Sequence, residues 1–354
     1  MLSPAELTIS VIIPVYNGGK NFHRCLSSLA EAIPSPDAIT VVADGDTDGS
    51  WRVAEQFGAR VIRIPGPGGP ARARNIGAHA AQGDILLFID ADVAVYPDIL
   101  SRVAAAFRCE PDLAAVFGCY DDAPTETNFL SQYKNLLHHY VHQTASEKAS
   151  TFWGACGAIR REVFLALGGF DEGYRQPSIE DVELGCRLKQ AGYRIGLCKT
   201  LQVKHMKRWS VVSLIKSDFL HRALPWATLI LRERRFINDL NVKRSSRVSV
   251  ILTYGLLGAL VEAWWWPKSL AVAGALVLVL LTLNAPVYRF FQKQRGVRFA
   301  LQTIPWHWLY HFYCGIAFAM SAVRHLFCRL RFPCTGPPET FGKWSDKKEG
   351  SGSR

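Results

Sequence analysis

The sequence lacks the cysteine patterns that would cross-link a small fold or hold a structural metal. It contains nine cysteines in 354 residues, and none of them forms a C-x-x-C pair. An odd number of scattered cysteines argues against both a disulfide framework and a structural zinc site. We therefore expect reduced thiols, as in a cytosolic compartment.

Two nucleotide-binding signatures are also missing. No G-x-G-x-x-G follows the first apolar stretch, and no G-x-x-x-x-G-K-[ST] occurs. The common dinucleotide and P-loop modes of phosphate binding therefore lose their main support. The composition, 49% hydrophobic and 20% charged, is nevertheless that of a folded chain and shows no low-complexity bias.

Acidic residues are scarce in the second part of the chain. From Lys199 onward there are about 24 basic residues against about 7 acidic ones, and about eight of the ten tryptophans. Residues up to 198 have about 17 basic and about 23 acidic side chains, so the net charge of +11 combines about −6 with about +17. Because the basic part also has the longest apolar runs, it indicates a membrane surface and no nucleic acid partner.

The first 90 residues alternate between strand-like and helix-like stretches. Apolar, β-branched runs lie at 9–13, 38–42, 60–64 and 84–89, and helical patterns follow the first three. This alternation predicts an α/β fold with βαβ units and a mostly parallel central sheet. Ligands of such sheets bind at the carboxyl ends of the strands, which is where the acidic clusters fall.

Carboxylates and arginines mark candidate chemistry at these strand ends. Asp90 and Asp92 follow an apolar strand, and two carboxylates at this spacing can reach one divalent cation, or one cation and a ribose hydroxyl. Taken alone, the pattern equally suits a solvated turn. Arg72 and Arg74 follow a glycine-rich loop at the start of a predicted helix, a position that suits an anion.

Glu180 and Asp181 lie at the start of another predicted helix. Carboxylates at this position often do no more than interact with the helix dipole. A carboxylate that faces a bound alcohol also serves as a general base, an effect of about 10²- to 10⁴-fold in rate.

Taken in order, these motifs resemble the family 2 glycosyltransferases of GT-A fold. The matching motifs are Val-Ile-Ile-Pro-Val-Tyr-Asn at 11–17, Asp-Gly-x-Thr-Asp-Gly-Ser at 44–50, Ala-Arg-Asn-x-Gly at 73–77, Asp-x-Asp at 90–92, Gly-Gly-Phe-Asp at 168–171 and Glu-Asp at 180–181. The resemblance covers about residues 8–210. It implies a nucleotide-diphosphate-sugar donor, a divalent metal (Mg²⁺ or Mn²⁺) and inversion at the anomeric carbon.

The resemblance also implies roles for individual residues. Those implied for the nucleotide are Pro14, Tyr16, Asp44 and Arg74, with Asp90 on the ribose side; Asp92 is implied as a metal ligand, and Asp181, with Glu180 beside it, as the catalytic base. The chain departs from the family where Ala43 replaces the first of two aspartates and Asp46 replaces a serine. These departures bear on which base of the nucleotide is selected.

A later segment, His-Met-Lys-Arg-Trp at 205–209, is similar to the Gln-x-x-Arg-Trp motif of processive members. The similarity implies that His205 is a late metal ligand, that Arg208 contacts the diphosphate and that Trp209 stacks on an acceptor. We group Gly154 with Arg208 and Trp209 in this diphosphate and acceptor region. The alternative is a plain basic segment at a membrane surface, which arginine and tryptophan also suit.

The apolar runs predict the domain organisation. We expect a glycosyltransferase domain at 1–205, a basic amphipathic interfacial segment at 206–247, a membrane region at 248–327 and a basic tail at 328–354. The membrane region has predicted spans at about 248–266 and 269–288 and a third apolar helix at about 303–322, which we place at the interface. Basic clusters lie outside both spans, so we expect a multi-pass protein of the inner or plasma membrane with a cytoplasmic catalytic domain.

The sequence therefore predicts a membrane-attached, metal-dependent, inverting glycosyltransferase whose acceptor is a hydroxyl group of a lipid or lipid-linked molecule. A polyprenyl phosphate is the nearest alternative acceptor; it is already ionised and needs no base, whereas the Glu-Asp pair favours an alcohol. A non-catalytic membrane assembly partner is an alternative from another class. It would have no need of Asp90, Asp92 and Asp181 together.

Overall fold

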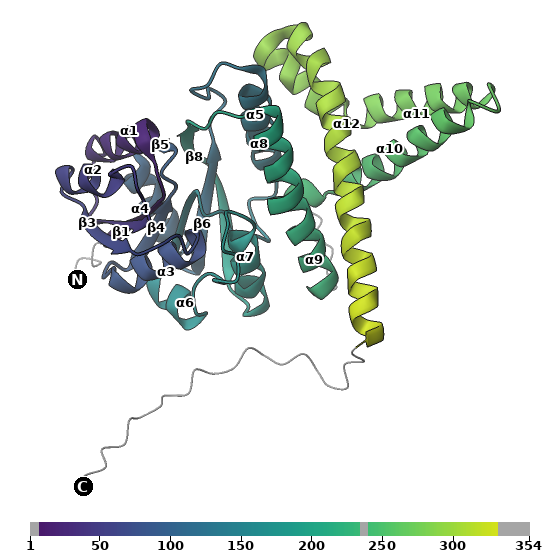
Figure 1. The fold of residues 1–354 in the computed structure, drawn as a ribbon. Helices are drawn as coiled ribbons and strands as arrows, with labels where there is room; N and C mark the ends of the chain where they lie inside the picture. The colour runs from purple at the N-terminus through teal and green to yellow at the C-terminus, as the bar shows by residue number, and fades with distance from the viewer. Residues whose placement is uncertain (1–6, 234–239, 332–354) are drawn as a thin grey trace.

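A computed structural model describes residues 7–233 and 240–331. In Figure 1, a sheet flanked by helices forms the N-terminal part, and a group of helices follows at its side. The strands are β1 (Ile9–Val15), β2 (Ala38–Asp44), β3 (Arg60–Ile64), β4 (Ile85–Ile89), β5 (Val93–Val95), β6 (Leu113–Tyr120), β7 (Cys156–Arg160) and β8 (Arg194–His205).

All eight strands form one sheet in the order β3-β2-β1-β4-β7-β6-β8-β5. The prediction of a mostly parallel sheet holds for β3, β2, β1 and β4, which run parallel to one another. It also holds for the parallel pair of β6 and β8, but not for β7, which is antiparallel to both of its neighbours, or for β5, which is antiparallel to β8. The irregular segment 144–155 separates β7 from the preceding helix, so no βαβ unit forms there, and the sheet is mixed.

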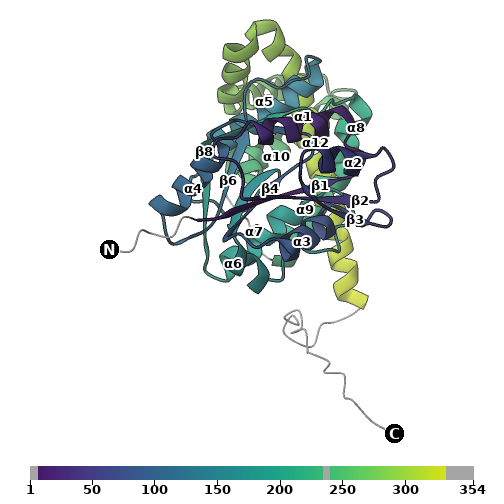
Figure 2. The same cartoon turned by 90° about the vertical axis from the view of Figure 1, so that its left-hand side faces the viewer.

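Helices cover both faces of the sheet, as Figure 2 shows. Side chains of α1 (Gly19–Ala30) and α4 (Ile99–Cys109) join the apolar cluster on one face. Those of α3 (Pro70–Ala80), α6 (Arg161–Ala166) and α7 (Glu180–Gln190) join the cluster on the other. The α2 helix (Ser50–Gln56) packs beside β2 and β3, and α5 (Phe129–Gln143) beside β6.

A helical region follows β8. Its elements are α8 (Val211–Lys216), a π-helical turn η1 (Ser217–Ala223), α9 (Leu224–Glu233), a short 3₁₀ turn η2 (Leu240–Val242), α10 (Arg244–Glu262), α11 (Ser269–Leu283) and α12 (Ala285–Arg331). The α12 helix is interrupted at Gly296, where φ is 85°. Phe291 of α12 is buried against Tyr133 and Leu136 of α5, so this region shares an apolar core with the sheet-bearing part.

The predicted membrane elements have different boundaries in the structure. The α10 helix ends at Glu262, so Trp264, Trp265 and Trp266 lie in the turn before α11 and do not continue the helix, because Pro267 cannot extend it. The α11 helix ends at Leu283, and residues 303–322 lie within the longer helical part of α12 that follows Gly296.

Within 7–233 and 240–331, no individual helix has the combination of length and apolar character needed to cross a bilayer. The segments Ser269–Leu283 and Ala285–Phe327 meet those criteria only when taken together, as a pair bent by 62°.

Candidate active site

The candidate site lies at the end of β4, where the chain turns into β5 and β5 pairs with the end of β8. The parallel pairing of β1 with β2 and with β4 brings the carboxyl ends of these strands to one edge of the sheet, where Asp44 and Asp90 follow buried residues. Asp90 donates its backbone N–H to the carbonyl of Ala155, 3.2 Å away. The Asp-Ala-Asp turn is therefore held against the segment that enters β7.

Asp92 and His205 lie side by side because β5 pairs with the end of β8, in a register that places Val93 opposite His205. The Oδ2 atom of Asp92 is 3.8 Å from Nε2 of His205. The imidazole stacks on the ring of Tyr120, with centroids 4.1 Å apart and planes inclined by 10°. Burial by itself would raise the pKa of Asp92, but His205 and then Lys207 outweigh it, and the pKa falls to about 2. Asp92 is therefore ionised at neutral pH.

The donor set at this position fits a divalent ion that shares its coordination with a substrate. Residues 7–233 and 240–331 bring no three His, Cys, Asp or Glu side chains together for a metal. Asp92 and His205 nevertheless present one carboxylate oxygen and one imidazole nitrogen next to each other. Ions such as Mg²⁺ and Mn²⁺ bind through few protein carboxylates and take further ligands from phosphates and water. The pair thus fits an ion completed by a bound diphosphate.

Arg74 connects the Asp-Ala-Asp turn to the start of α7. Its guanidinium is buried and bonds to Oδ1 of Asp90 at 2.6 Å and to Oε1 of Glu180 at 2.8 Å. Burial opposes the charge of Arg74, but Asp90 and Glu180 outweigh this effect and raise its pKa. The other oxygen of Glu180 accepts the N–H of Ser178. Arg74 and Glu180 are thus both held in this ion-pair bridge. Glu180, which the sequence places beside the predicted base, therefore orients Arg74.

Asp181 is partly exposed at the first turn of α7. Its Oδ2 accepts a hydrogen bond from the backbone N–H of Gly154 at 2.9 Å, so Gly154 orients the carboxylate predicted as the base. Burial, followed by the charge of Glu180, raises the pKa of Asp181 to about 6 against the opposing effects of the Gly154 N–H and Arg74. A carboxylate with such a pKa accepts a proton more readily than an ordinary aspartate does.

The predicted nucleotide-side residues lie on loops after β1 and β2. Pro14 is half-buried within β1, and Tyr16, 57% exposed, follows the strand. The two oxygens of Asp44 accept the N–H groups of Gly68 and Gly69 at 2.8 and 2.7 Å. Asp44 therefore fixes the glycine-rich loop, and a predicted contact with the nucleotide base must use its remaining lone pairs.

Glycine is required at position 69 of that loop. Its φ is 94°, and a Cβ atom there would lie 2.6 Å from the backbone of Arg175. The chain that approaches α7 therefore passes directly over the loop that precedes α3.

Arg208 and Trp209 differ in exposure, and only the burial of Trp209 disagrees with its predicted role. Arg208 is 75% exposed along its side chain, with a long contact of 3.4 Å to Glu126. Trp209 is only 3% exposed and packs against Leu130 and Leu214, so its ring anchors the segment after β8 and presents no stacking surface to an acceptor. Tyr120, the residue that stacks on His205, was not among the residues predicted from the sequence. The signal that could have identified it is its position as the last residue of the buried strand β6.

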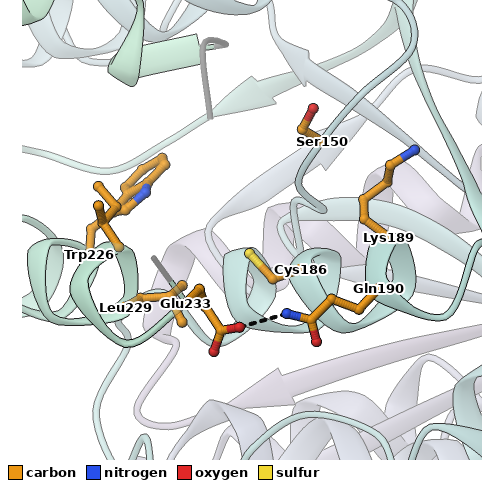
Figure 3. Close-up of a pocket in the computed structure, with 8 residues that line it drawn as sticks. Ser150, Cys186, Lys189, Gln190, Trp226, Leu229 and Glu233 are labelled. Carbon is orange, nitrogen blue, oxygen red and sulfur yellow. Dashed lines mark hydrogen bonds between the residues drawn. The ribbon is translucent and has the colours of Figure 1, made fainter. Parts of the chain in front are cut away.

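A cavity of about 190 Å³ lies elsewhere, between α7 and α9 (Figure 3). Cys186, Lys189 and Gln190 face it from α7, and Trp226 and Leu229 from α9. These α7 positions come five to nine residues after Asp181, one or more helical turns along. The cavity is therefore separate from the carboxylate cluster.

Comparison with known proteins gives consistent matches. Residues 10–168 match the family described as glycosyl transferase family 2. An uncharacterized glycosyltransferase of Haemophilus influenzae is 28% identical over 221 residues, which cover 57% of this chain and 70% of that protein. Succinoglycan biosynthesis protein ExoA of Rhizobium meliloti is 27% identical over 253 residues, which cover 63% of this chain and 75% of that protein. Several other curated glycosyltransferases are matched over less than half of their length.

One solved structure resembles almost the whole chain. It is the mannosyltransferase PcManGT of Pyrobaculum calidifontis in complex with GDP-Man and Mn²⁺, with a TM-score of 0.55, 18% identity and coverage of 89% of this chain and 87% of that one. At this identity the likeness speaks for the fold, and it confirms the predicted GT-A-like α/β architecture.

Proposed function

The chain belongs to the family 2 glycosyltransferases, and from this premise we propose that it transfers a sugar from a nucleotide-diphosphate-sugar to a hydroxyl group of a lipid or lipid-linked acceptor, with inversion. The observation that carries the proposal is the placement of Asp181: partly exposed, oriented by Gly154, and raised in pKa to about 6. A phosphate acceptor would need no such base.

The site has an acceptor side, which contains Asp181, and a metal side, which contains Asp92 and His205. Asp181 takes the proton of the acceptor hydroxyl as its oxygen bonds to the anomeric carbon, while the bond from that carbon to the diphosphate oxygen breaks. The bridge from Asp90 through Arg74 to Glu180 holds the two sides at a fixed separation. Asp92 and His205 would hold Mg²⁺ or Mn²⁺, which neutralises charge on the departing diphosphate when bound.

The Asp92→Asn variant tests the metal site. We expect at least about a 100-fold loss of transfer, as is typical when a charge-stabilising group is removed from an active site, together with weaker Mn²⁺ binding. Electron paramagnetic resonance of added Mn²⁺ measures the second effect independently of activity. Unchanged Mn²⁺ binding and transfer in this variant would remove Asp92 from the site.

The pH profile tests the base. With a pKa of about 6 for Asp181, transfer should rise with pH through about 6 and then level off, because only the ionised carboxylate accepts a proton. The same raised pKa makes the folded protein hold a proton that the unfolded chain has already released above pH 4, so this carboxyl lowers stability as the pH rises from about 4 to 6. A rate profile flat between pH 5 and 7 would contradict the assignment.

We further propose that the helices after η2 attach the enzyme to the cytoplasmic face of the cell membrane. Apolar side chains point outward along both helices of the α10–α11 pair, such as Ile251 and Leu278, and Trp264 in its turn is 86% exposed. Figure 1 shows this pair extending away from the sheet. Basic residues flank it, including Lys243 before α10 and Arg289 after α11, which supports a cytoplasmic location for both ends.

A panel experiment tests the reaction and the acceptor together. Membranes that contain the full chain are incubated with radiolabelled nucleotide-sugars, and label is followed into the lipid extract. Label that is stable to mild acid supports transfer to a hydroxyl group. Label released by mild acid as the single transferred sugar indicates a bond to phosphate and favours the polyprenyl phosphate alternative, whereas label released within a larger saccharide still indicates transfer to a hydroxyl group of a lipid-linked acceptor. Label that enters no lipid from any donor contradicts the lipid acceptor.

A further inference from the structure

Three cationic side chains near the site have no ion pair with a carboxylate in the part of the chain that the structure describes. They are Lys207, which lies over the ring of Trp209, Lys216 and Arg222, and all three are exposed. The pKa of His221, in the same segment, is lowered first by burial and then by the charges of Lys216, Lys207 and Arg222. By contrast, Arg232 on the next helix pairs with Glu233 at 2.9 Å.

The π-helical turn η1 that contains Arg222 is anchored on two sides. Asp218 of this turn is buried, with one oxygen 2.5 Å from Lys134 of α5 and the other accepting the hydroxyl of Tyr313 of α12 at 2.8 Å. These bonds place Arg222, four residues later, in a defined position. Insertions of this helix type often occur at functional sites.

The same turn is bonded to the loop that presents the base. Ser178 donates its hydroxyl to the carbonyl of His221 at 2.7 Å, and its N–H to Glu180 at 2.9 Å. Arg222 is therefore adjacent to a residue that is one hydrogen bond from the start of α7.

Through His221 and Ser178, Arg222 lies on the side of the site where α7 begins and Asp181 is found. Burial opposes its charge, but Asp218, Tyr120 and Asp181 together raise its pKa. Tyr120 stacks under His205, and Asp181 is the proposed base. The Arg222 side chain is exposed to solvent. The charge of Lys207, in contrast, lowers the pKa of Asp92 on the metal side.

We propose that Arg222 binds a phosphate group carried by the acceptor, beside Asp181. This inference rests on the proposed glycosyltransferase function and names the chemistry of its acceptor. An arginine without a carboxylate partner, open to solvent next to the base, suits bidentate contact with phosphate. The phosphate belongs either to a lipid carrier or to a soluble phosphorylated acceptor.

The test uses the full chain in a polyoxyethylene detergent with Mg²⁺ and a saturating nucleoside diphosphate, UDP or GDP, so that the donor phosphate site is filled. Binding of decyl phosphate, decanol and inorganic phosphate is measured by calorimetry. In the wild type, decyl phosphate should bind at least about 10-fold more tightly than decanol, as expected for hydrogen bonds to a charged group. Arg222→Gln should lose that preference, Arg222→Lys should keep part of it, and Arg232→Gln, the matched loss of charge, should retain it.

Each result has a defined meaning. Inorganic phosphate that binds as tightly as decyl phosphate indicates a soluble phosphorylated acceptor, and preference for decyl phosphate indicates a lipid-linked one; both support the proposal. Equal binding of decyl phosphate and decanol to the wild type overturns it. So does an Arg222→Gln variant that weakens nucleoside diphosphate binding but not decyl phosphate binding, because Arg222 then belongs to the donor site. If the wild type does not bind the nucleoside diphosphate, the proposed function is contradicted. Even then, phosphate binding that is lost in Arg222→Gln would identify Arg222 as the anion site.

Discussion

Replacing Asp181 by asparagine is expected to slow sugar transfer to a hydroxyl acceptor by about 10²- to 10⁴-fold, the usual contribution of a positioned general base. Asparagine keeps an oxygen that accepts the Gly154 N–H, so the start of α7 should retain its conformation. It cannot take the acceptor proton. Donor binding should be unchanged, because Asp181 accepts hydrogen bonds from Gly154 and Val182, whereas Asp44 fixes the glycine-rich loop on the nucleotide side. Initial rates with saturating donor, beside donor titrations by calorimetry, measure the two effects separately.

Asp98→Asn is a matched control for this variant. It also neutralises one aspartate, but Asp98 lies on the surface in a pair with Arg102, so transfer should stay at the wild-type rate. A normal rate in Asp181→Asn would have a clear chemical meaning. Either the acceptor oxygen is already ionised, as in a phosphate, or another group takes the proton. The product that mild acid releases distinguishes these two explanations: the single transferred sugar indicates a phosphate acceptor, and a larger saccharide or an acid-stable product indicates a hydroxyl acceptor.

The carboxyl ends of the strands were predictable because local pattern determines them. An apolar run that stops at an acidic turn identifies Asp90 and Asp92 as edge residues whatever the rest of the chain does. The helix start at Glu180 was predictable for the same reason, and α7 does begin there. The mixed order of the sheet was not, because the antiparallel course of β7 depends on how segment 144–155 returns to the sheet.

Long-range partners could not be read from the sequence. Arg74 pairs with Glu180 across 106 positions, and no local signal distinguishes it from the exposed Arg72 two residues earlier. The burial of Trp209 could not be predicted from the sequence either, because tryptophan occurs in packed apolar clusters as well as at membrane surfaces. Arg222 lies in a basic segment where no local pattern distinguishes one cation from another, and only the hydrogen bond from Ser178 to His221 places its turn beside the start of α7.

Replacing Arg74 by methionine is expected to destabilise the fold by about 3–5 kcal/mol, the usual result of removing one partner from a buried ion pair. Glu180 would keep its charge in a buried position, and among residues 7–233 and 240–331 its remaining hydrogen-bond partner would be the Ser178 N–H. Asp181 would change as well, because Arg74 is one of the groups that lower its pKa. The midpoint of the pH–rate profile should therefore move above about 6 in any protein that folds. Urea unfolding measures the first effect, and initial rates against pH measure the second.

Two further variants separate the bridge from a general effect of losing an arginine. Arg102→Met breaks an exposed pair with Asp98 and should lower the free energy of unfolding by no more than about 1 kcal/mol. Adding Glu180→Gln to Arg74→Met removes the uncompensated buried charge and should restore part of the lost stability. It should not restore transfer, because Asp90 and the start of α7 would still be unconnected. If the double variant were as unstable as the single one, the cost would lie in the packing of the arginine against Phe170 and not in its charge.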